Sequence, residues 1–433
     1  MSGDHALPHF RFRPDQPSLW AMFRTGIADV GSVIPEAILD QWTVPLTGPG
    51  APLVVSSPEL AREVLNDRAD HFTRDRLIRR IFRRSWGTGL AAAEGADWQR
   101  QRRAAAPFFT PKAVAYHLAA FVVAADAVLD RLSDGEAVDL GELAAQIVAR
   151  IVLSVLVDGA DQVDPDAAAR DVSPYVRRLT GFTLKDLLPL PESLIDRLQG
   201  IDRDRAVLRL RAMAARLAGV RADKKQRADM IALIEGVGPI EDNIRGLFPA
   251  AMDTTVAGLG WALNTLALRP DWQQRLAAEG RAMGRMPRLE HLDETRHVVS
   301  EVLRLYPPAP LLARAAAHDG TLGGHPVRAG QTVIVAVYAM HRHRHLWQDP
   351  DTFDPDRFRS GAGNLDAFMP FGTGPRMCIA AHFAQLEMAV ILARVLRRFR
   401  IESAGPGPEV SLQVTTCAIG GLRATLHRHH PAG

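Results

Sequence analysis

Apolar side chains recur at helical spacing along most of this 433-residue chain, and this periodicity limits the folds open to it. The pattern runs through long segments that each end at a glycine, a proline or a charge cluster: residues 112–133, 139–157, 203–220, 241–268, 271–283, 292–305 and 380–399. Strands are predicted in only two places, at residues 53–55 and 332–337. The sequence therefore predicts a mainly α fold with a minor β region.

The chain shows no internal repeat and no long linker between these segments. Gly323-Gly324 and Ala329-Gly330 precede the second predicted strand and are typical of tight turns. The Pro- and Gly-rich stretch 404–408 is short and lies between apolar segments, so we interpret it as a loop. Length alone would favour two or three domains, but we expect residues 1–433 to form a single domain.

Composition places the chain among ordinary globular proteins, since 47% of its residues are hydrophobic and 23% are charged. The first thirty residues contain several charges and no apolar run long enough for a signal peptide or membrane anchor, so we expect a cytoplasmic protein. A formal net charge of +3 does not favour a nucleic-acid partner. Arginine supplies nearly all of the cationic charge, which hints at a bacterial source.

Two tracts rich in histidine and arginine admit two interpretations. Residues 341–345 read His-Arg-His-Arg-His, residues 427–430 read His-Arg-His-His, and either tract has side chains that bind metals. The alternative is a solvated cationic surface, which is the commoner role of a charge run. We therefore expect both tracts to face solvent.

Cys378 follows a turn rich in glycine and proline, residues 371–377, and precedes the helical segment 379–399. A cysteine at a helix N-terminus, beside Arg376 and loop amides, is favoured as thiolate, the form that metal ligands and nucleophiles require. A buried structural cysteine is the other interpretation of these residues. Cys417 is the only other cysteine, so there is no disulfide framework.

The turn resembles the haem-binding signature of the cytochrome P-450 family, in which a phenylalanine, two glycines and an arginine precede the proximal cysteine. The resemblance implies haem b as the cofactor and Cys378 as its iron ligand, with Phe371, Gly372 and Arg376 around it. Such a thiolate pushes electron density towards the iron. Ala380 departs from the pattern, which usually has glycine there, but a methyl group is a small change and we expect haem to bind.

Two further motifs are similar to those of the same family. Glu301 and Arg304 resemble its Glu-x-x-Arg motif, and Arg357 resembles the arginine that completes a buried network with them. Guanidinium–carboxylate pairs of this kind form bidentate hydrogen bonds, which would tie the helix to the segment before the cysteine. The resemblance implies a role in folding and haem retention rather than in the reaction.

Four residues resemble the family's partners for the haem propionates. Trp98 and Arg102 are similar to the helix that binds the propionates through an aromatic N–H and a guanidinium, and Arg314 and Arg376 resemble further partners. Guanidinium groups suit carboxylates because they donate two parallel hydrogen bonds. The resemblance therefore implies that these side chains converge on the cofactor.

Residues 250–255 place an acid and two hydroxyls behind two small residues on the helix predicted at 241–268. A threonine in mid-helix can bond back to an earlier carbonyl and loosen the backbone, although the bland alternative is simply a polar helix face. The segment resembles the family's oxygen-activating motif, with Ala250 and Ala251 beside the cofactor and Ala251 in place of the usual glycine. Asp253 and Thr254 take the acid and alcohol positions, which implies a proton relay.

The resemblance implies a monooxygenase that uses O2 to oxidise an apolar small molecule of terpenoid, fatty-acyl, steroid or aromatic class. The sequence has no flavin domain, dinucleotide fingerprint or iron–sulfur pattern. Electrons would therefore come from a separate ferredoxin or flavodoxin-type protein with an NAD(P)H-dependent reductase, and we expect a monomer. Two alternatives stay open: a peroxide-dependent or rearranging haem-thiolate enzyme, and a non-catalytic haem-binding sensor or carrier.

Partner and substrate surfaces follow from the same resemblance. Electron carriers are usually acidic, so a basic patch near the cysteine would receive one; its expected members are Arg100, Arg103, Arg342, Arg344, Arg397 and Arg398. Substrate contacts are expected from a loop at 76–90, the helix around Phe248 and Ala251, residues 310–313 and residues 415–418.

Overall fold

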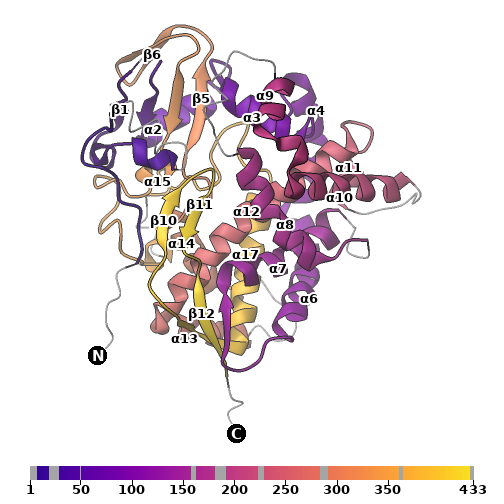
Figure 1. Ribbon diagram of the computed structural model, residues 1–433. Coiled ribbons are helices and arrows are strands. Elements are labelled where there is room, and N and C mark those ends of the chain that lie inside the picture. The colour runs from indigo at the N-terminus through magenta and orange to yellow at the C-terminus, as the bar shows by residue number, and fades with distance from the viewer. Residues whose placement is uncertain are drawn as a thin grey trace.

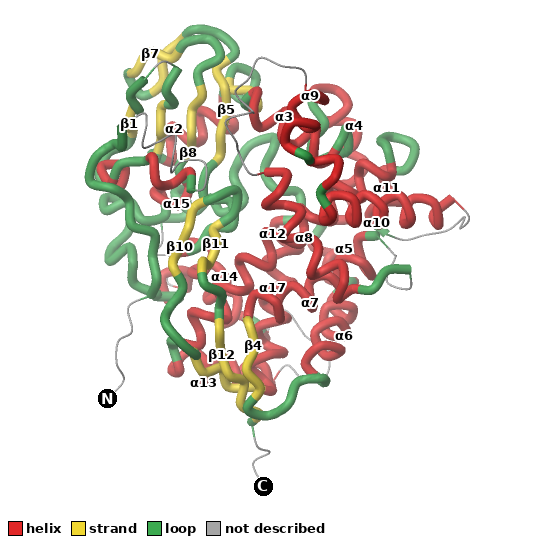
Figure 2. The backbone as a smooth tube through the Cα atoms, in the orientation of Figure 1, coloured by secondary structure: helices red, strands yellow, loops and turns green. Residues whose placement is uncertain are grey.

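Helices make up most of the computed structural model (Figures 1 and 2). The structure describes residues 7–18, 29–48, 50–157, 162–180, 192–222, 229–282, 291–359 and 364–429. Its α-helices are α2 (Pro58–Arg62), α3 (Arg76–Trp86), α4 (Gly95–Ala105), α5 (Pro111–Tyr116), α6 (Leu118–Leu129), α7 (Leu140–Ile151), α8 (Pro165–Thr180), α9 (Glu192–Gln199), α10 (Arg205–Ala222), α11 (Met230–Ile234), α12 (Ile240–Ala267), α13 (Pro270–Ala282), α14 (Asp293–Leu305), α15 (Val337–Met340), α16 (Asp356–Arg359) and α17 (Ala381–Arg398). The prediction of a mainly α fold is confirmed.

The strands of the described residues form small separate sheets. They are β1 (Thr43–Pro45), β2 (Leu53–Val55), β3 (Phe72–Arg74), β4 (Glu136–Asp139), β5 (Leu312–Ala316), β6 (Gly320–Leu322), β7 (His325–Val327), β8 (Thr332–Val335), β9 (Phe399–Ser403), β10 (Glu409–Leu412), β11 (Thr416–Ile419) and β12 (Arg423–Arg428). The largest sheet has the order β1-β2-β8-β5-β3, and the others are β4-β12-β9, β10-β11 and β6-β7. Figure 1 shows the largest sheet at the upper left, beside the helical body.

The predicted helical segments agree with the structure, and one of them is divided. Residues 112–133 form α5 and α6, which meet at His117, where the backbone (φ −88°, ψ 0°) leaves regular helical geometry. The His117 ring stacks on Phe108 at 4.9 Å between centroids. Residues 139–157 form α7, which a π-helical turn over Val152–Leu156 extends. Periodicity therefore found the apolar faces but not this break.

Both predicted strands are confirmed, but the second one ends two residues earlier than predicted. Residues 53–55 form β2, whereas the run 332–337 leaves the sheet after Val335 and begins α15 at Val337. The expected turn at Gly323-Gly324 joins β6 to β7, and both glycines have positive φ values, 56° and 80°. Residues 404–408 connect β9 to β10 without regular structure, as expected for a loop.

Helix α12 runs through the middle of the helical body and packs against α7, α8, α10 and α17 (Figure 1). Its C-terminal half is almost wholly buried, from Gly258 to Ala267. A Cβ on Gly260 would approach Leu422 to 3.0 Å, so a glycine here lets α12 lie close to its neighbours. A second apolar cluster lies between the largest sheet and α2. No helix within the described residues is long and apolar enough to cross a membrane.

Candidate functional site

Cys378 ends a tight loop that two glycines shape, residues 371–378, here called the cysteine loop. Gly372 and Gly374 have φ values of 69° and 75°, a conformation that side chains other than hydrogen disfavour. A Cβ on Gly374 would lie 2.2 Å from the carbonyl oxygen of Leu65, so only glycine fits. The Cys378 amide donates to the Phe371 carbonyl at 3.0 Å and closes the loop. The thiol is therefore held by backbone geometry.

The Cys378 thiol is exposed to solvent although protein atoms surround it closely. This burial raises the pKa of the thiol above its ordinary value, and it outweighs the Ala380 amide and the Arg102 guanidinium, which lower the pKa. Helix α17 begins only at Ala381, so its dipole starts three residues beyond the cysteine. The expectation that the loop alone favours thiolate is therefore wrong. A bound metal would reverse the balance, because a coordinating thiol is deprotonated.

Three arginines and a glutamate gather beside the cysteine loop, and we call them the loop cluster: Arg74, Arg314, Arg376 and Glu94. Arg74 on β3 stands directly opposite Arg314 in the antiparallel pairing of β3 with β5. Glu94 forms ion pairs with Arg74 at 3.1 Å and with Arg376 at 2.6 Å. The Arg314 guanidinium donates to the adjacent Ala313 carbonyl at 2.9 Å. One carboxylate thus forms ion pairs with two of the three guanidinium groups.

The loop cluster carries unbalanced positive charge. Like charges directly opposite one another on paired strands destabilise the pair. Burial is the largest cause that lowers the pKa of Arg74 to about 10, and repulsion from Arg376 is the second. The same two effects lower the pKa of Arg314 to about 10. An anion placed between these groups would relieve the repulsion. The arrangement is therefore suited to binding a negatively charged ligand.

Helix α4 joins the same region through Trp98 and Arg102. The Arg376 guanidinium lies over the Trp98 ring at 4.4 Å, and the Arg102 guanidinium lies 5.7 Å from it. Arg102 also donates to the Met377 carbonyl at 2.8 Å, next to the cysteine. The structure therefore brings Trp98, Arg102, Arg376 and Cys378 together, and Arg314 joins them through the loop cluster.

The acid–threonine pair lies midway along α12. The Thr254 hydroxyl donates to the Ala250 carbonyl at 2.8 Å, which confirms the expected bond back to an earlier carbonyl. Pro249 lies inside the helix and has no N–H to donate, so the helical hydrogen-bond ladder is interrupted just before Ala250. Two local features therefore loosen this turn of α12, where Ala251 packs as a half-buried side chain.

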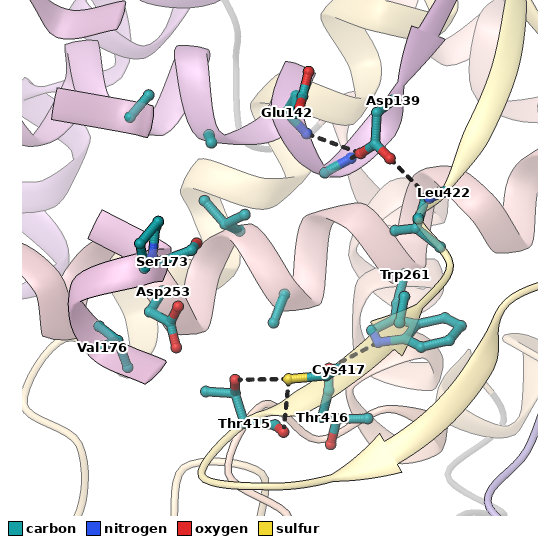
Figure 3. A pocket seen from close by; sticks show the side chains of 18 of the residues that line it. Asp139, Glu142, Ser173, Val176, Asp253, Trp261, Thr415, Thr416, Cys417 and Leu422 are labelled. Carbon is teal, nitrogen blue, oxygen red and sulfur yellow. Dashed lines mark hydrogen bonds between the residues drawn. The ribbon is translucent and has the colours of Figure 1, made fainter. Parts of the chain in front are cut away.

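A cavity of about 730 Å³ opens beside Asp253 (Figure 3). Its walls come from α7, α8, α12 and the turn between β10 and β11. Asp253 reaches into it from α12, near Ser173 of α8, and Trp261 lies two helical turns further along the same wall. Thr415 and Cys417 form the facing wall. This volume lies in the range of small-molecule pockets.

The predicted substrate-contact segments divide in the structure. Residues 415–418 line the cavity, whereas Phe248, Ala251 and residues 310–313 do not. The expectation of a loop at residues 76–90 is wrong, because residues 76–86 form α3. The Asp75 side chain caps this helix by accepting from the amides of residues 77 and 78.

The second predicted arginine network is present and buried, and we call it the helix cluster: Glu301, Arg304 and Arg357. Arg304 donates to both carboxylate oxygens of Glu301, at 2.7 and 2.8 Å, and both side chains are fully buried. Arg357 approaches the same carboxylate at 3.3 Å. The remaining Arg304 donors reach the carbonyls of His341, Pro350 and Thr352. The cluster therefore ties α14 to the segment that precedes the cysteine loop.

Residues 341–343 are buried, so the expectation of a solvated tract is wrong for them. His341 lies 3.1 Å from the Arg304 carbonyl and accepts from the Met369 amide at 2.9 Å. Burial lowers the pKa of His341 to about 3, and the ring is neutral. Arg344 and His345 are exposed, as are Arg428 and His429 of the second tract. His430 lies outside the described residues, and within those described no side chains form a metal-ligand cluster.

The predicted basic patch is mostly neutralised. Arg342 is buried and pairs with Asp351 at 3.0 Å. Arg344 and Arg398 also form ion pairs with acidic side chains, and Arg100 pairs with Asp97 at 2.8 Å. Arg397 is half-buried, whereas Arg103 is exposed. The expectation is therefore wrong for Arg342, and ion pairs offset the charge of Arg100, Arg344 and Arg398.

Sequence reasoning missed Arg74, Glu94 and Trp261. None of them lies in a local motif that points to a ligand. Arg74 acquires its role from strand pairing, and Glu94 from its contacts with Arg74 and Arg376. For Trp261 the sequence offered one indication of a role in the site, because Trp261 lies on the same predicted helix as Asp253.

Residues 46–416 match the sequence pattern of the family described as Cytochrome P-450. The chain is 30% identical to cyclooctat-9-en-7-ol 5-monooxygenase of Streptomyces melanosporofaciens over 387 residues. The aligned region covers 82% of this chain and 81% of that protein. The chain is also 26% identical over 437 residues to the chloroplastic protein LUTEIN DEFICIENT 5 of Arabidopsis thaliana, covering 88% of this chain and 70% of that protein. The chain belongs to the cytochrome P-450 family, whose members are oxidoreductases that bind haem b through a cysteine thiolate.

Proposed function

We propose that this protein is a haem-thiolate monooxygenase in which Cys378 ligates the haem iron and the loop cluster binds the haem propionates. The observation that carries this proposal is the pairing of Arg74 with Arg314 across β3 and β5, beside a solvent-exposed thiol. Both guanidinium groups are half-buried, and Glu94, the carboxylate that forms an ion pair with Arg74, is shared with Arg376. A bound dianion would supply the negative charge that this arrangement lacks.

The residues present fit this cofactor in number and chemistry. The loop cluster has three guanidinium groups and one carboxylate, so its formal surplus is two positive charges, which equals the charge of two propionates. Guanidinium–carboxylate pairs are among the strongest hydrogen-bonded pairs in proteins. Arg102 and Trp98 extend the same surface, and Phe371 and Gly372 complete the cysteine loop. We therefore assign these residues to cofactor binding.

Haem with a thiolate ligand supplies the reductive activation of O2. The chain's own contribution is to deliver protons, and we assign this to Thr254 and Asp253. The Thr254 proton is directed to the Ala250 carbonyl, so the hydroxyl oxygen is oriented to accept a hydrogen bond from water. Asp253 reaches the cavity, where it can exchange a proton with solvent. Ala250 and Ala251 leave room beside the cofactor because their side chains are small.

The substrate we propose is an apolar small molecule of terpenoid, fatty-acyl, steroid or aromatic class. Support comes from the apolar side chains of the cavity wall, among them Val176, Val256 and Trp261, which lie beside polar ones such as Glu142 and Asp253. The relative from Streptomyces is named as a monooxygenase of cyclooctat-9-en-7-ol. We therefore expect a ligand that is mainly hydrocarbon.

We propose a separate ferredoxin or flavodoxin-type electron donor with an NAD(P)H-dependent reductase, since the sequence has no flavin domain, dinucleotide fingerprint or iron–sulfur pattern. We also propose that the protein acts as a monomer in the cytoplasm of a bacterium, with residues 1–433 as one catalytic domain. Arg103 is exposed and remains a candidate contact for an acidic carrier. The substitution Arg103→Glu reverses this charge and should slow the first electron transfer if that contact forms.

The deciding experiment is the carbon monoxide difference spectrum of the reduced protein. A thiolate-ligated haem absorbs far to the red of a histidine-ligated one, so we expect a thiolate-type band. Cys378→Ala should abolish the band, and Cys417→Ala is the matched control that should keep it. A histidine-type band from folded protein, or the same spectrum in both variants, would overturn the assignment.

Turnover separates the leading proposal from its two alternatives. With NADPH and a surrogate ferredoxin system we expect oxygen-dependent product from a monooxygenase, peroxide-dependent product from a peroxide-using enzyme, and none from a sensor. Thr254→Ala should retain haem but divert reducing equivalents to hydrogen peroxide, because the proton relay is broken. Equal coupling in Thr254→Ala and the wild type would contradict the relay.

A further inference from the structure

The cavity wall that carries Thr415 and Cys417 belongs to β10 and β11, a two-stranded ribbon whose position depends on the rest of the protein. Strands β10 and β11 pair only with each other, and their turn carries Thr415 and Cys417 into the cavity. An isolated two-stranded ribbon is marginally stable in water. The position of these two side chains must therefore be set by contacts between the ribbon and the helical body.

Thr416 makes those contacts with all of its polar groups. Its amide donates to the Pro308 carbonyl at 3.1 Å, and its hydroxyl donates to the Pro307 carbonyl at 2.6 Å. Its own carbonyl accepts from the indole N–H of Trp261 at 3.0 Å. Thr416 is 1% exposed and lies in the cavity wall between Thr415 and Cys417, which line the same cavity. The buried residue thus fixes the two that face the ligand space.

Trp261 is itself held in one orientation. Its ring stacks on Tyr306 with 4.3 Å between centroids and 3° between planes, and it is fully buried. The Tyr306 hydroxyl donates to the Pro8 carbonyl at 2.7 Å, and the Arg342 guanidinium lies 5.8 Å from the Tyr306 ring. A buried, stacked indole offers its N–H in a single direction, so the Trp261–Thr416 bond fixes the ribbon relative to α12.

The same helix carries the acid of the proposed relay. Asp253 and Trp261 are eight residues apart on α12, which is about 12 Å along its axis, and both line the cavity. The Trp261–Thr416 hydrogen bond therefore links the ribbon directly to the helix that carries Asp253, whereas the Pro307 and Pro308 carbonyls hold it to the segment after α14. In Figure 3 this bond joins the helix to the strand that bears Thr416 and Cys417.

We propose that Trp261 is a positioning residue that sets substrate selectivity by holding the Thr415 and Cys417 wall against α12. This inference rests on the proposed function, because it takes the cavity wall to shape the ligand space above the haem. Trp261 also lines the cavity, but its positioning role acts through Thr416.

The test compares Trp261→Phe with Trp272→Phe in the holoenzyme. Phenylalanine keeps an aromatic ring against Tyr306 but removes the N–H donor and part of the ring volume. Trp272 is also buried and also packs in an aromatic pair, with Phe353, but it lies on α13 and does not line the cavity. Any effect of losing indole volume alone should therefore appear in both variants.

The first measurement is the alkylation rate of Cys417 by iodoacetamide, followed by peptide mass spectrometry. Losing one buried hydrogen bond corresponds to roughly a fivefold change in a local equilibrium. We expect Cys417 to react about fivefold faster in Trp261→Phe and at the wild-type rate in Trp272→Phe. An unchanged rate in Trp261→Phe would refute the positioning role, and this measurement does not depend on enzymatic activity.

The second measurement is the ratio of dissociation constants for 4-phenylimidazole and imidazole, read from the haem spectrum. Both probes ligate a haem iron, but only the phenyl group senses the surrounding walls. We expect the ratio to change at least about threefold in Trp261→Phe and to stay constant in Trp272→Phe. A faster thiol reaction with an unchanged ratio overturns the selectivity role. Absence of any spectral response in the wild type would instead contradict the proposed function.

Discussion

The loop cluster and the helix cluster are both built from arginines around one glutamate, but they balance their charges differently. In the helix cluster, Arg304 uses all of its donors on Glu301 and on three backbone carbonyls. In the loop cluster, the hydrogen bond that Arg314 makes within the described residues goes to the adjacent carbonyl, and the side chain faces Arg74 across the sheet. The first arrangement is complete within the folded chain, whereas the second keeps a surplus of positive charge that the proposed propionates would balance.

The difference teaches how to tell a structural charge network from a binding one. A network that serves the fold neutralises and hydrogen-bonds every buried group, because an unpaired buried charge is costly. A network that serves a ligand leaves like charges close together, and it is relieved only when the ligand arrives. The helix cluster follows the first pattern and the loop cluster the second. Three measurements probe this distinction.

The largest effect is expected from Glu301→Gln. This change leaves Arg304 fully buried without its carboxylate, and removing one partner of a buried pair costs about 3–5 kcal/mol. Urea unfolding followed by tryptophan fluorescence measures the loss. The matched variant Glu94→Gln should lower the unfolding free energy by less than about 1 kcal/mol, because Glu94 is 41% exposed. Equal losses in the two variants would remove the distinction.

A smaller effect with a different signature is expected from Arg314→Leu. Losing a charge-assisted hydrogen bond to a propionate should speed haem release about 10- to 100-fold, which transfer to excess apomyoglobin measures. The unfolding free energy of the cofactor-free chain should not fall, since the substitution relieves repulsion with Arg74 and Arg376. Haem release at the wild-type rate, or a stability loss like that of Glu301→Gln, would place Arg314 in a structural role.

The third effect appears only when the pH is lowered, and it concerns acid stability. His341 is buried next to Arg304, and its pKa of about 3 lies below the ordinary value of 6.5. Between these values the unfolded chain binds a proton that the folded chain excludes, so stability is lost as the pH falls from 6.5 towards 3, by up to about 1.4 kcal/mol per pH unit. His341→Gln should flatten this slope, while exposed His345→Gln should leave it unchanged. A slope that survives in His341→Gln would assign the acid sensitivity elsewhere.

Local signals in the sequence predicted the helices and the cysteine loop well. The apolar period of α12, α14 and α17 follows from their own residues, and Gly372 and Gly374 mark backbone positions that other side chains disfavour. Local signals failed where burial depends on distant segments. His341 and Arg342 read as a solvated cationic run, yet they pack against α14 and the segment that follows it.

The sequence by itself determined the family, the helical periodicity and the residue types that a haem site requires, because these are properties of short segments. Only the tertiary structure decided that Arg74 stands opposite Arg314, since strand pairing joins residues far apart in the chain. It also decided that Trp261 holds Thr416, and that burial raises the pKa of the Cys378 thiol. Charge balance and desolvation depend on everything within a few ångströms of a group, and sequence order does not record those neighbours.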